Sequence, residues 1–355
     1  MRLTKVSLEN FRNYANVSIA TDADLVLILG QNSSGKTNFL ESVYYLSRLG
    51  SFRAPDVALV RRGADFFAVR GQIGEHEYEA MMQVSPKPAR QCKTDGIKIK
   101  RSLWQMFRTV LFVPNDLNLF ILGPIFRRKF LDETLSQQSS VYNLNLTSLE
   151  HVLKQRGALL QLLSRGEGSR TELEFWNQEL ARVAIAIRKD RRAFVDFLNA
   201  KFQPATVQLT GFDYECQIQF TTFANIADEA EFLAELGRLE EAEIRSNKNL
   251  LGPHRDDFIV NKDGELNIYN SSRGELRVQI LALKLLQAEY LSDENQKPII
   301  LLDDVFSELD ELRRAKLIES LGGHQIFITS TEEHHLPKLK KETLVLTVAD
   351  GQVQI

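Results

Sequence analysis

Apolar positions change their spacing twice along the chain, and this predicts three successive regions. Residues 1 to about 110 carry short apolar runs at 3–8 and 25–29, which are typical of strands, and one stripe at helical spacing after residue 37. Two turn signals, Gly74-Glu75 and Asp95-Gly96, predict two β-hairpins in the same region. The first region is therefore expected to be rich in strands, with one helix.

Residues 127–250 instead repeat their apolar side chains at helical spacing, in two stripes. The stripes consist of Leu149, Val152, Leu153, Leu159, Leu160 and Leu163, and of Leu173, Trp176, Leu180, Val183, Ile187, Phe194 and Leu198. A polar connector at 164–169 separates them and indicates an antiparallel helical hairpin. This arm is too short to be a long coiled-coil rod.

From about residue 255 the strand pattern returns. Apolar runs at 299–302 and 325–328 alternate with helical segments, which is typical of a sheet covered by helices on both faces. A last hairpin is predicted around Asp350-Gly351. The sequence thus predicts an α/β fold in which a helical lobe interrupts a strand-rich head.

Composition restricts the classes of protein that this chain can represent. Its hydrophobic content of 43% is enough for a sizeable core, and its net charge of -3 means that any nucleic-acid surface must be local. The two cysteines, Cys92 and Cys216, have no metal-ligand spacing and are too few for a disulfide framework. With no signal-peptide pattern and no apolar stretch of membrane-spanning length, the chain is expected to be soluble and cytoplasmic.

Residues 30–37 read G-Q-N-S-S-G-K-T, the spacing of the phosphate-binding loop G-x-x-x-x-G-K-[ST], between a predicted strand and a predicted helix. Such a loop directs backbone N–H groups and a helix N-terminus at an anion. Lys36 is expected to reach the β- and γ-phosphates of ATP, and the Thr37 hydroxyl to ligate Mg²⁺. The predicted nucleotide-binding residues of this segment are Gly30, Gln31, Asn32, Ser33, Ser34, Gly35, Lys36, Thr37 and Asn38. A flexible polar turn is the alternative, and the flanking strand and helix favour the nucleotide site.

The run 299–304 has the Walker B form, a buried strand that ends in two carboxylates. The first, Asp303, is predicted to hold Mg²⁺, and the second, Asp304, to polarise the attacking water. With Lys36 they are the predicted catalytic residues. Two acids after a strand also cap helices in ordinary loops. The pair therefore indicates a Walker B motif only because the chain also contains a phosphate loop. Asp304 is one methylene shorter than the glutamate common at this position, which predicts slow turnover.

Two further segments resemble motifs of ABC-type ATPases. Residues 307–310, S-E-L-D, resemble the D-loop, and Asp310 is included in the predicted site. Residues 271–275, S-S-R-G-E, open a helix and resemble the ABC signature, with Ser272, Arg273, Gly274 and Glu275 as predicted nucleotide contacts. In that motif a serine, a glycine and a helix N-terminus contact the γ-phosphate from a second subunit.

Taken together, the motifs resemble the RecF family of DNA replication and repair ATPases from end to end. The resemblance is carried by Phe11-Arg12-Asn13-Tyr14, Gly30 to Glu41, Pro114-Asn115-Asp116-Leu117, Gly123-Pro124 with Arg127-Arg128 and Phe130-Leu131-Asp132, Gly252 to Asp257, and Asp303 to Asp310. It implies an SMC/ABC-like head formed by residues 1–126 and 251–355, with a helical arm lobe at 127–250.

The same resemblance implies an activity and a set of partners. It implies a weak, DNA-stimulated ATPase whose ATP-dependent homodimer holds two nucleotides between its subunits, with ATP and Mg²⁺ as cofactors. It also implies sequence-nonspecific binding to double-stranded DNA and to single-strand/double-strand junctions. Cooperation with RecO and RecR in loading RecA at gapped DNA follows from the resemblance alone.

The chain departs from the family pattern at several positions. Ser33-Ser34 replaces a glycine-containing pair, Ser271 stands where leucine is common, and Glu275 stands where glutamine is common, which places a negative charge near the trans phosphate. No histidine follows the strand at Thr329, where many ABC proteins carry a switch histidine. Thr329 or Thr331 is the preferred candidate for sensing the γ-phosphate, ahead of His334 and His335.

Several basic clusters are candidates for DNA contact, although a solvated charged surface explains most such clusters. Arg188 and Arg192 lie one helical turn apart on the arm. The predicted DNA-contacting residues are Lys98, Lys100, Arg101, Arg188 and Arg192. Their contacts would be mainly with phosphates, and a dimer would double the patch.

Two other functions remain open on the sequence. A small-molecule phosphotransferase could use the same phosphate loop, but it has no need of a signature motif. A nucleotide-binding scaffold that never hydrolyses ATP is compatible with the short Asp304 side chain.

Overall fold

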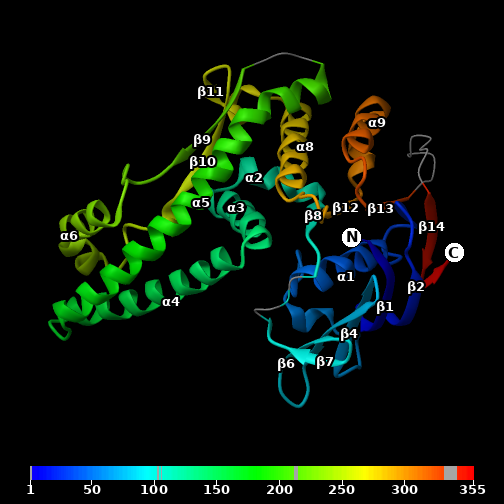
Figure 1. The fold of residues 1–355 in the computed structure, drawn as a ribbon, viewed down its shortest axis with the longest axis horizontal. Helices are drawn as coiled ribbons and strands as arrows, with labels where there is room; N and C mark the ends of the chain where they lie inside the picture. Colours follow the sequence, from blue (N-terminus) through cyan, green and yellow to red (C-terminus); the bar gives the residue numbers. More distant parts are fainter. Residues whose placement is uncertain (1, 102–103, 105, 212–214, 332–341) are drawn as a thin grey trace. The chain divides into compact units, whose positions relative to one another are not determined.

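The computed structural model describes residues 2–101, 104, 106–211, 215–331 and 342–355, which form two compact units (Figure 1). Unit 1 consists of Met1–Asp116 and Ile280–Ile355, and unit 2 of Leu117–Gln279. The helix α8 (Arg273–Tyr290) begins in unit 2 and ends in unit 1. The division into a head and an arm lobe at 126 and 250 stays a prediction about functional domains.

Unit 1 contains an antiparallel sheet of six strands in the order β2-β1-β4-β5-β6-β7. Its strands are β1 (Leu3–Phe11), β2 (Tyr14–Ala20), β4 (Phe66–Ile73), β5 (His76–Gln83), β6 (Ala89–Thr94) and β7 (Ile97–Ile99). Both predicted hairpins are present, β4–β5 and β6–β7. Asp95 and Gly96 have φ of 51° and 77°, the left-handed conformation that a tight two-residue hairpin turn requires.

A second six-stranded sheet in unit 1 has the order β15-β14-β3-β13-β12-β8. Its strands are β3 (Leu25–Leu29), β8 (Thr109–Phe112), β12 (Ile299–Asp303), β13 (Ile326–Ser330), β14 (Thr343–Ala349) and β15 (Gln352–Gln354). All neighbouring pairs are parallel except β14–β15, which forms the predicted C-terminal hairpin. The two apolar runs at 299–302 and 325–328 are adjacent central strands, as their lack of polar alternation predicts.

The helix α1 (Lys36–Arg48) lies between these two sheets and contacts strands of both. Its stripe Phe39, Leu40, Val43 and Leu46 is completely buried in the main hydrophobic core of the unit. Shorter helices of unit 1 are η1 (Asp56–Leu59), η5 (Val305–Glu308) and α9 (Glu311–Ser320), and η3 (Pro114–Leu117) ends at the boundary. The first helix therefore starts directly at the phosphate loop and is fixed by core packing along its length.

Unit 2 is mainly helical. Its helices are α2 (Asn118–Ile121), α3 (Pro124–Gln138), α4 (Ser140–Leu163), α5 (Arg170–Thr210), α6 (Glu229–Ser246), η4 (Pro253–Arg255) and α7 (Asn267–Asn270). The helices α4 and α5 lie side by side (green in Figure 1) and form the predicted hairpin, with the loop at 164–169. Ser139 and Ser169 cap the two helices by accepting hydrogen bonds from Tyr142 N and Glu172 N.

A small antiparallel sheet in unit 2 adds a strand, β9 (Cys216–Thr221), to the range 127–250, which was predicted from its spacing to be helical. Its strand order is β11-β10-β9, with β10 (Asp257–Lys262) and β11 (Glu265–Leu266). The strand β9 alternates buried and exposed residues, and it packs on α5. Six residues with period two are a weak signal between long helical stripes, and the strand was missed for that reason.

Among the described residues, no helix has both the length and the apolar character needed to cross a membrane.

Candidate nucleotide site

The phosphate loop follows β3 and ends where α1 begins at Lys36. Two groups from the β1–β2 turn hold it from outside: Asn13 Nδ2 donates to Ser34 O at 3.0 Å, and the Tyr14 hydroxyl donates to Gly35 O at 2.9 Å. Gly35 has φ of 122°, and a Cβ there would lie 2.6 Å from Asn13 Nδ2. The loop thus needs a glycine at this position because of its backbone conformation and its close neighbour.

Lys36 folds back over the loop that it terminates. Its Nζ donates to Gly30 O at 2.8 Å and to Gln31 O at 2.9 Å. Burial lowers the pKa of Lys36, although the nearby carboxylates of Asp304 and Asp303 oppose this shift. Within the described part of the chain, the hydrogen-bond partners of this largely buried ammonium group are neutral carbonyls, so the group is well placed to accept an anionic ligand.

Asp303, the last residue of β12, lies between the neighbouring strand β13 and the first turn of α1. Its Oδ1 accepts hydrogen bonds from Thr37 Oγ1 at 2.8 Å and from Thr329 Oγ1 at 2.9 Å. Burial raises the pKa of Asp303, against the effect of these two hydroxyl donors. The contact between Thr37 and Asp303 brings the two predicted metal ligands together across 266 positions of sequence.

The oxygen atoms at this point have the chemistry that Mg²⁺ requires. A hydroxyl and a carboxylate are hard oxygen ligands, so Thr37 and Asp303 would hold Mg²⁺ together with oxygens of the nucleotide phosphates. The buried Ser34 Oγ has no hydrogen-bond partner among the described residues. An unmatched hydroxyl donor in a phosphate loop fits a phosphate oxygen. The role of Ser34 in phosphate binding stays a prediction, and its unmatched hydroxyl is consistent with that role.

Asp304 leaves the strand in an unusual conformation. Its φ is 53°, its backbone N–H donates to Thr329 Oγ1 at 2.9 Å, and the residue is exposed. A left-handed non-glycine residue held by a hydrogen bond is a strained position of the kind that collects at functional sites. Thr329 is therefore occupied in orienting both acids, and its part in sensing the γ-phosphate stays a prediction. His334 and His335 lie outside the described residues.

A cavity of about 520 Å³ adjoins the start of α1, and no motif predicted it as a pocket. Its lining residues are Arg12, Asn13, Asn38, Arg53, Ala54, Ala58 and Val60. The two guanidinium groups are held by one completely buried carboxylate, Glu41, which Arg12 contacts through Nε and Nη2 at 2.9 Å and Arg53 through Nη2 at 2.8 Å. Burial alone would raise the pKa of Glu41, but these hydrogen bonds hold the pKa below its usual value. The cluster has one more positive than negative charge.

The predicted signature lies at the first turn of α8, in unit 2. Ser272, Arg273 and Gly274 are exposed, and Ser272 N donates to Glu275 Oε2 at 2.8 Å while Glu275 N donates to Ser272 Oγ at 3.3 Å. This reciprocal pair is a capping box, which satisfies two of the free N–H groups of the helix. The N–H groups of Arg273 and Gly274 have no hydrogen-bond partner among the described residues, so they can face an anion.

Asp310 caps α9 and accepts a hydrogen bond from Arg313 N at 2.8 Å. Ser307 Oγ donates to Asp304 O at 2.7 Å, which ties the predicted D-loop to the second carboxylate of the Walker B segment. Asp310 therefore has a structural role at the start of α9. Its predicted role in nucleotide binding stays a prediction.

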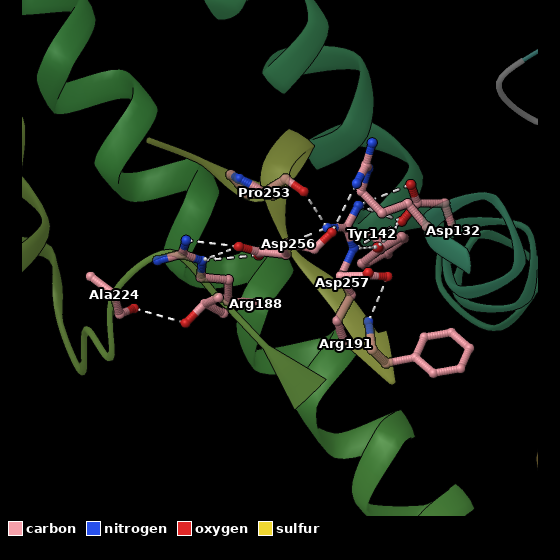
Figure 2. Close-up of polar contacts among 11 residues, drawn as sticks. Asp132, Tyr142, Arg188, Arg191, Ala224, Pro253, Asp256 and Asp257 are labelled. Carbon is pink, nitrogen blue, oxygen red and sulfur yellow. Dashed lines mark hydrogen bonds and ion pairs between the residues drawn. The ribbon is translucent and has the colours of Figure 1, made fainter. Parts of the chain in front are cut away.

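One predicted DNA contact, Arg188, is wrong (Figure 2). The residue is 4% exposed, and its guanidinium pairs with the completely buried Asp256, with Nε at 3.0 Å from Oδ2 and Nη2 at 2.8 Å from Oδ1. Its cationic group also lies 5.4 Å from the ring centroid of Phe232. A guanidinium enclosed in this way is unavailable to DNA. Exposed side chains are found at the other four positions, Lys98, Lys100, Arg101 and Arg192.

Arg188 belongs to a buried ionic cluster, defined here as Asp132, Tyr142, Arg188, Arg191 and Asp256 (Figure 2). Arg191 Nη2 lies 2.8 Å from Asp132 Oδ1 and its Nη1 donates to Pro253 O at 2.6 Å. The cluster links α3, α4 and α5 to the segment before β10. The acids of the Gly252–Asp257 motif therefore neutralise arginines inside unit 2: Asp256 pairs with Arg188, and Asp257 pairs with Arg127.

Comparison with known proteins gives consistent results. The chain matches the family described as RecF/RecN/SMC N terminal domain over residues 2–354. It is 34% identical over 354 residues to the DNA replication and repair protein RecF of Ruminiclostridium cellulolyticum, covering 96% of this chain and 95% of the relative. The corresponding protein of Streptomyces avermitilis is 33% identical over 376 residues, with 100% of both chains covered.

Solved structures agree with these relatives. The recombination mediator protein RecF-ATPrS in the RecFOR pathway has a TM-score of 0.91 and 28% identity, and the match covers 99% of this chain and 97% of that one. The SmcHead bound to the C-winged helix domain of ScpA has a TM-score of 0.57 at 14% identity, covering 100% and 96% of the two chains, and shares the fold. The expected SMC/ABC-like architecture is confirmed.

Proposed function

The chain belongs to the RecF/RecN/SMC N-terminal domain family, and from that premise we propose that it is an ATP-dependent DNA-binding protein of replication and recombinational repair. The observation that carries the proposal is the hydrogen bond between Thr37 and Asp303, at 2.8 Å. It places the phosphate loop and the Walker B carboxylate at one point, which a phosphoryl-transfer site requires.

Each residue of the loop has a distinct task in this proposal. The N-terminus of α1 and the loop N–H groups receive the β- and γ-phosphates, and Lys36 exchanges its two carbonyl partners for phosphate oxygens. Thr37 and Asp303 would hold Mg²⁺, which neutralises charge on the phosphate oxygens when it is bound. Asp304 orients the attacking water, and its short side chain makes hydrolysis slow.

The cavity beside α1 supports the same proposal on the nucleoside side. Asn38 follows the loop directly, and its Nδ2 donates to Asn13 Oδ1 at 2.6 Å, so the cavity wall is continuous with the loop support. Carboxamides and guanidinium groups in one cavity suit the ribose and base of a nucleotide together with an adjacent anionic oxygen.

The exposed turn at Ser272 to Gly274 completes the site from a second copy of the chain. ATP then joins two subunits into a dimeric clamp, and DNA phosphates are held by Lys98, Lys100, Arg101 and Arg192. Solved relatives are described as recombination mediators of the RecFOR pathway. On that basis we assign RecO and RecR as partners, acting to load RecA at single-strand gaps.

An ATPase assay with and without DNA tests this function. Wild-type protein should hydrolyse ATP slowly and faster with DNA, while Lys36→Met should lose both activities and Lys154→Met, an exposed lysine on α4, should retain them. The short side chain of Asp304 favours one alternative function, a scaffold that binds ATP without hydrolysis. ATP binding with no turnover in the presence of DNA would support the scaffold. A small-molecule phosphotransferase would hydrolyse or transfer phosphate without responding to DNA.

A further inference from the structure

Lys262 and Glu275 form an ion pair at the start of the signature helix. Lys262 ends β10, Glu275 lies in the first turn of α8, and Nζ is 2.6 Å from Oε1. The side chains are 10% and 35% exposed respectively. The lysine side chain is therefore mostly buried, whereas the carboxylate of Glu275 is partly exposed and lies close to the exposed turn at Ser272.

Both oxygens of Glu275 are occupied by groups of the chain itself. Oε1 faces Lys262, and Oε2 accepts the hydrogen bond from Ser272 N. The hydrogen bond from Lys262 is the largest of several causes that lower the pKa of Glu275, which favours the carboxylate form that an ion pair requires. The signature turn thus carries a full negative charge whose counter-ion comes from β10.

Lys262 also holds the loop that precedes the signature. Its Nζ lies 3.4 Å from Asn270 O, and Asn270 Nδ2 donates back to Lys262 O at 2.6 Å. The lysine contacts both sides of the turn, and its charge is directed at the one acidic side chain of the motif. A neutral side chain of similar length would keep the packing and lose this charge.

We propose that Lys262 is a positioning residue of the ATP-dependent dimer, which neutralises Glu275 so that the signature turn can approach a nucleotide polyphosphate. The inference rests on the proposed function, in which this turn contacts ATP bound to a second copy. A helix N-terminus attracts an anion through its free N–H groups and dipole, and a carboxylate without a counter-ion at the same place repels that anion. Lys262 removes the repulsion and leaves the capping box intact.

The dimer dissociation constant with Mg²⁺ and ATP, measured by sedimentation velocity, tests this proposal through charge rescue. Lys262→Met should weaken the dimer about fivefold to tenfold, because one partly exposed charge is left uncompensated. Adding Glu275→Gln should restore it, since glutamine keeps the capping box and removes the charge. Lys262→Arg should dimerise like the wild type, because arginine keeps the charge.

A matched control is Lys93→Met in the antiparallel sheet of unit 1, where Lys93 Nζ also lies 2.6 Å from a glutamate, Glu79 Oε1. This variant should dimerise normally. If Lys262→Met dimerises normally too, or if Glu275→Gln fails to rescue it, the electrostatic role is refuted. A wild-type chain that stays monomeric with ATP would instead refute the proposed function, and it would thereby also refute the role of Lys262.

Discussion

Replacing Asp256 with asparagine should destabilise unit 2 by about 3–5 kcal/mol, the cost of breaking a buried ion pair by removing one partner. Asp256 is completely buried, and it accepts three hydrogen bonds from Arg188, at 3.2, 3.0 and 2.8 Å. Arg191 Nη1 lies 3.9 Å from its Oδ2. The asparagine would keep the volume, but it would leave the enclosed Arg188 guanidinium facing a neutral amide, half of which is itself a donor. Arg191 would lose its weaker contact with Asp256 and keep its pairing with Asp132.

The upper part of this range is expected because water has little access to the pair. The side chain of Arg188 is 5% exposed and that of Arg191 is 2% exposed, so neither guanidinium regains its solvation without opening the unit. Asp196 provides the matched control, because it is an exposed acid on α5, the helix that carries Arg188 and Arg191. Asp196→Asn removes a charge from α5 without leaving a buried one, and it should shift stability little.

Urea unfolding followed by tryptophan fluorescence measures this loss in the correct unit. The chain has two tryptophans, of which Trp104 lies in unit 1 and Trp176 in unit 2, so Trp176 reports on unit 2 in a Trp104→Phe background. Asp256→Asn should lower the midpoint without changing the slope against urea. A loss below about 1 kcal/mol, the size expected of an ordinary surface change, would refute the reasoning.

The remaining predictions concern the cavity and the DNA surface. Glu41→Gln should weaken nucleotide binding about tenfold, because the charge-assisted contacts that hold Arg12 and Arg53 in the cavity are lost. Calorimetric titration with a slowly hydrolysed ATP analogue measures this affinity. An unchanged affinity would show that the cavity is not part of the nucleotide site. Reversing the charges of Lys98, Lys100, Arg101 and Arg192 together should lower DNA affinity and flatten its dependence on salt. Fluorescence anisotropy over a salt series checks this, and an unaltered slope would place the DNA contacts elsewhere.

The strands and helices that the sequence predicted correctly share one property, a long or continuous apolar pattern. The run 299–302 became the interior strand β12, and the two stripes at 149–163 and 173–198 became α4 and α5. The strand β9 was missed because its alternation is short and its partner β10 lies about 40 residues further along the chain. The local spacing of apolar residues predicts individual helices and strands, but it does not indicate which distant segments pair with each other.

The difference between local pattern and long-range pairing also explains which site residues were predicted correctly. Thr37 and Asp303 were predicted to meet because each belongs to a motif with a fixed place at the edge of a parallel sheet. Arg188 was assigned to the surface because helical spacing with Arg192 suggested a basic face, whereas its partner Asp256 is 68 positions away. Glu41 gave no signal either, since a lone acid near the apolar stripe of a helix is usually exposed. Its burial depends on arginines from loops on either side of α1.

Sedimentation velocity of the whole chain with Mg²⁺ and ATP, in the presence and absence of DNA, tests the central claim most directly. The account predicts a monomer with ADP, a dimer with ATP, further stabilisation of that dimer by DNA, and a monomer for Lys36→Met in every condition. A chain that remains monomeric with ATP and DNA, or a dimer that forms equally with ADP, would contradict it.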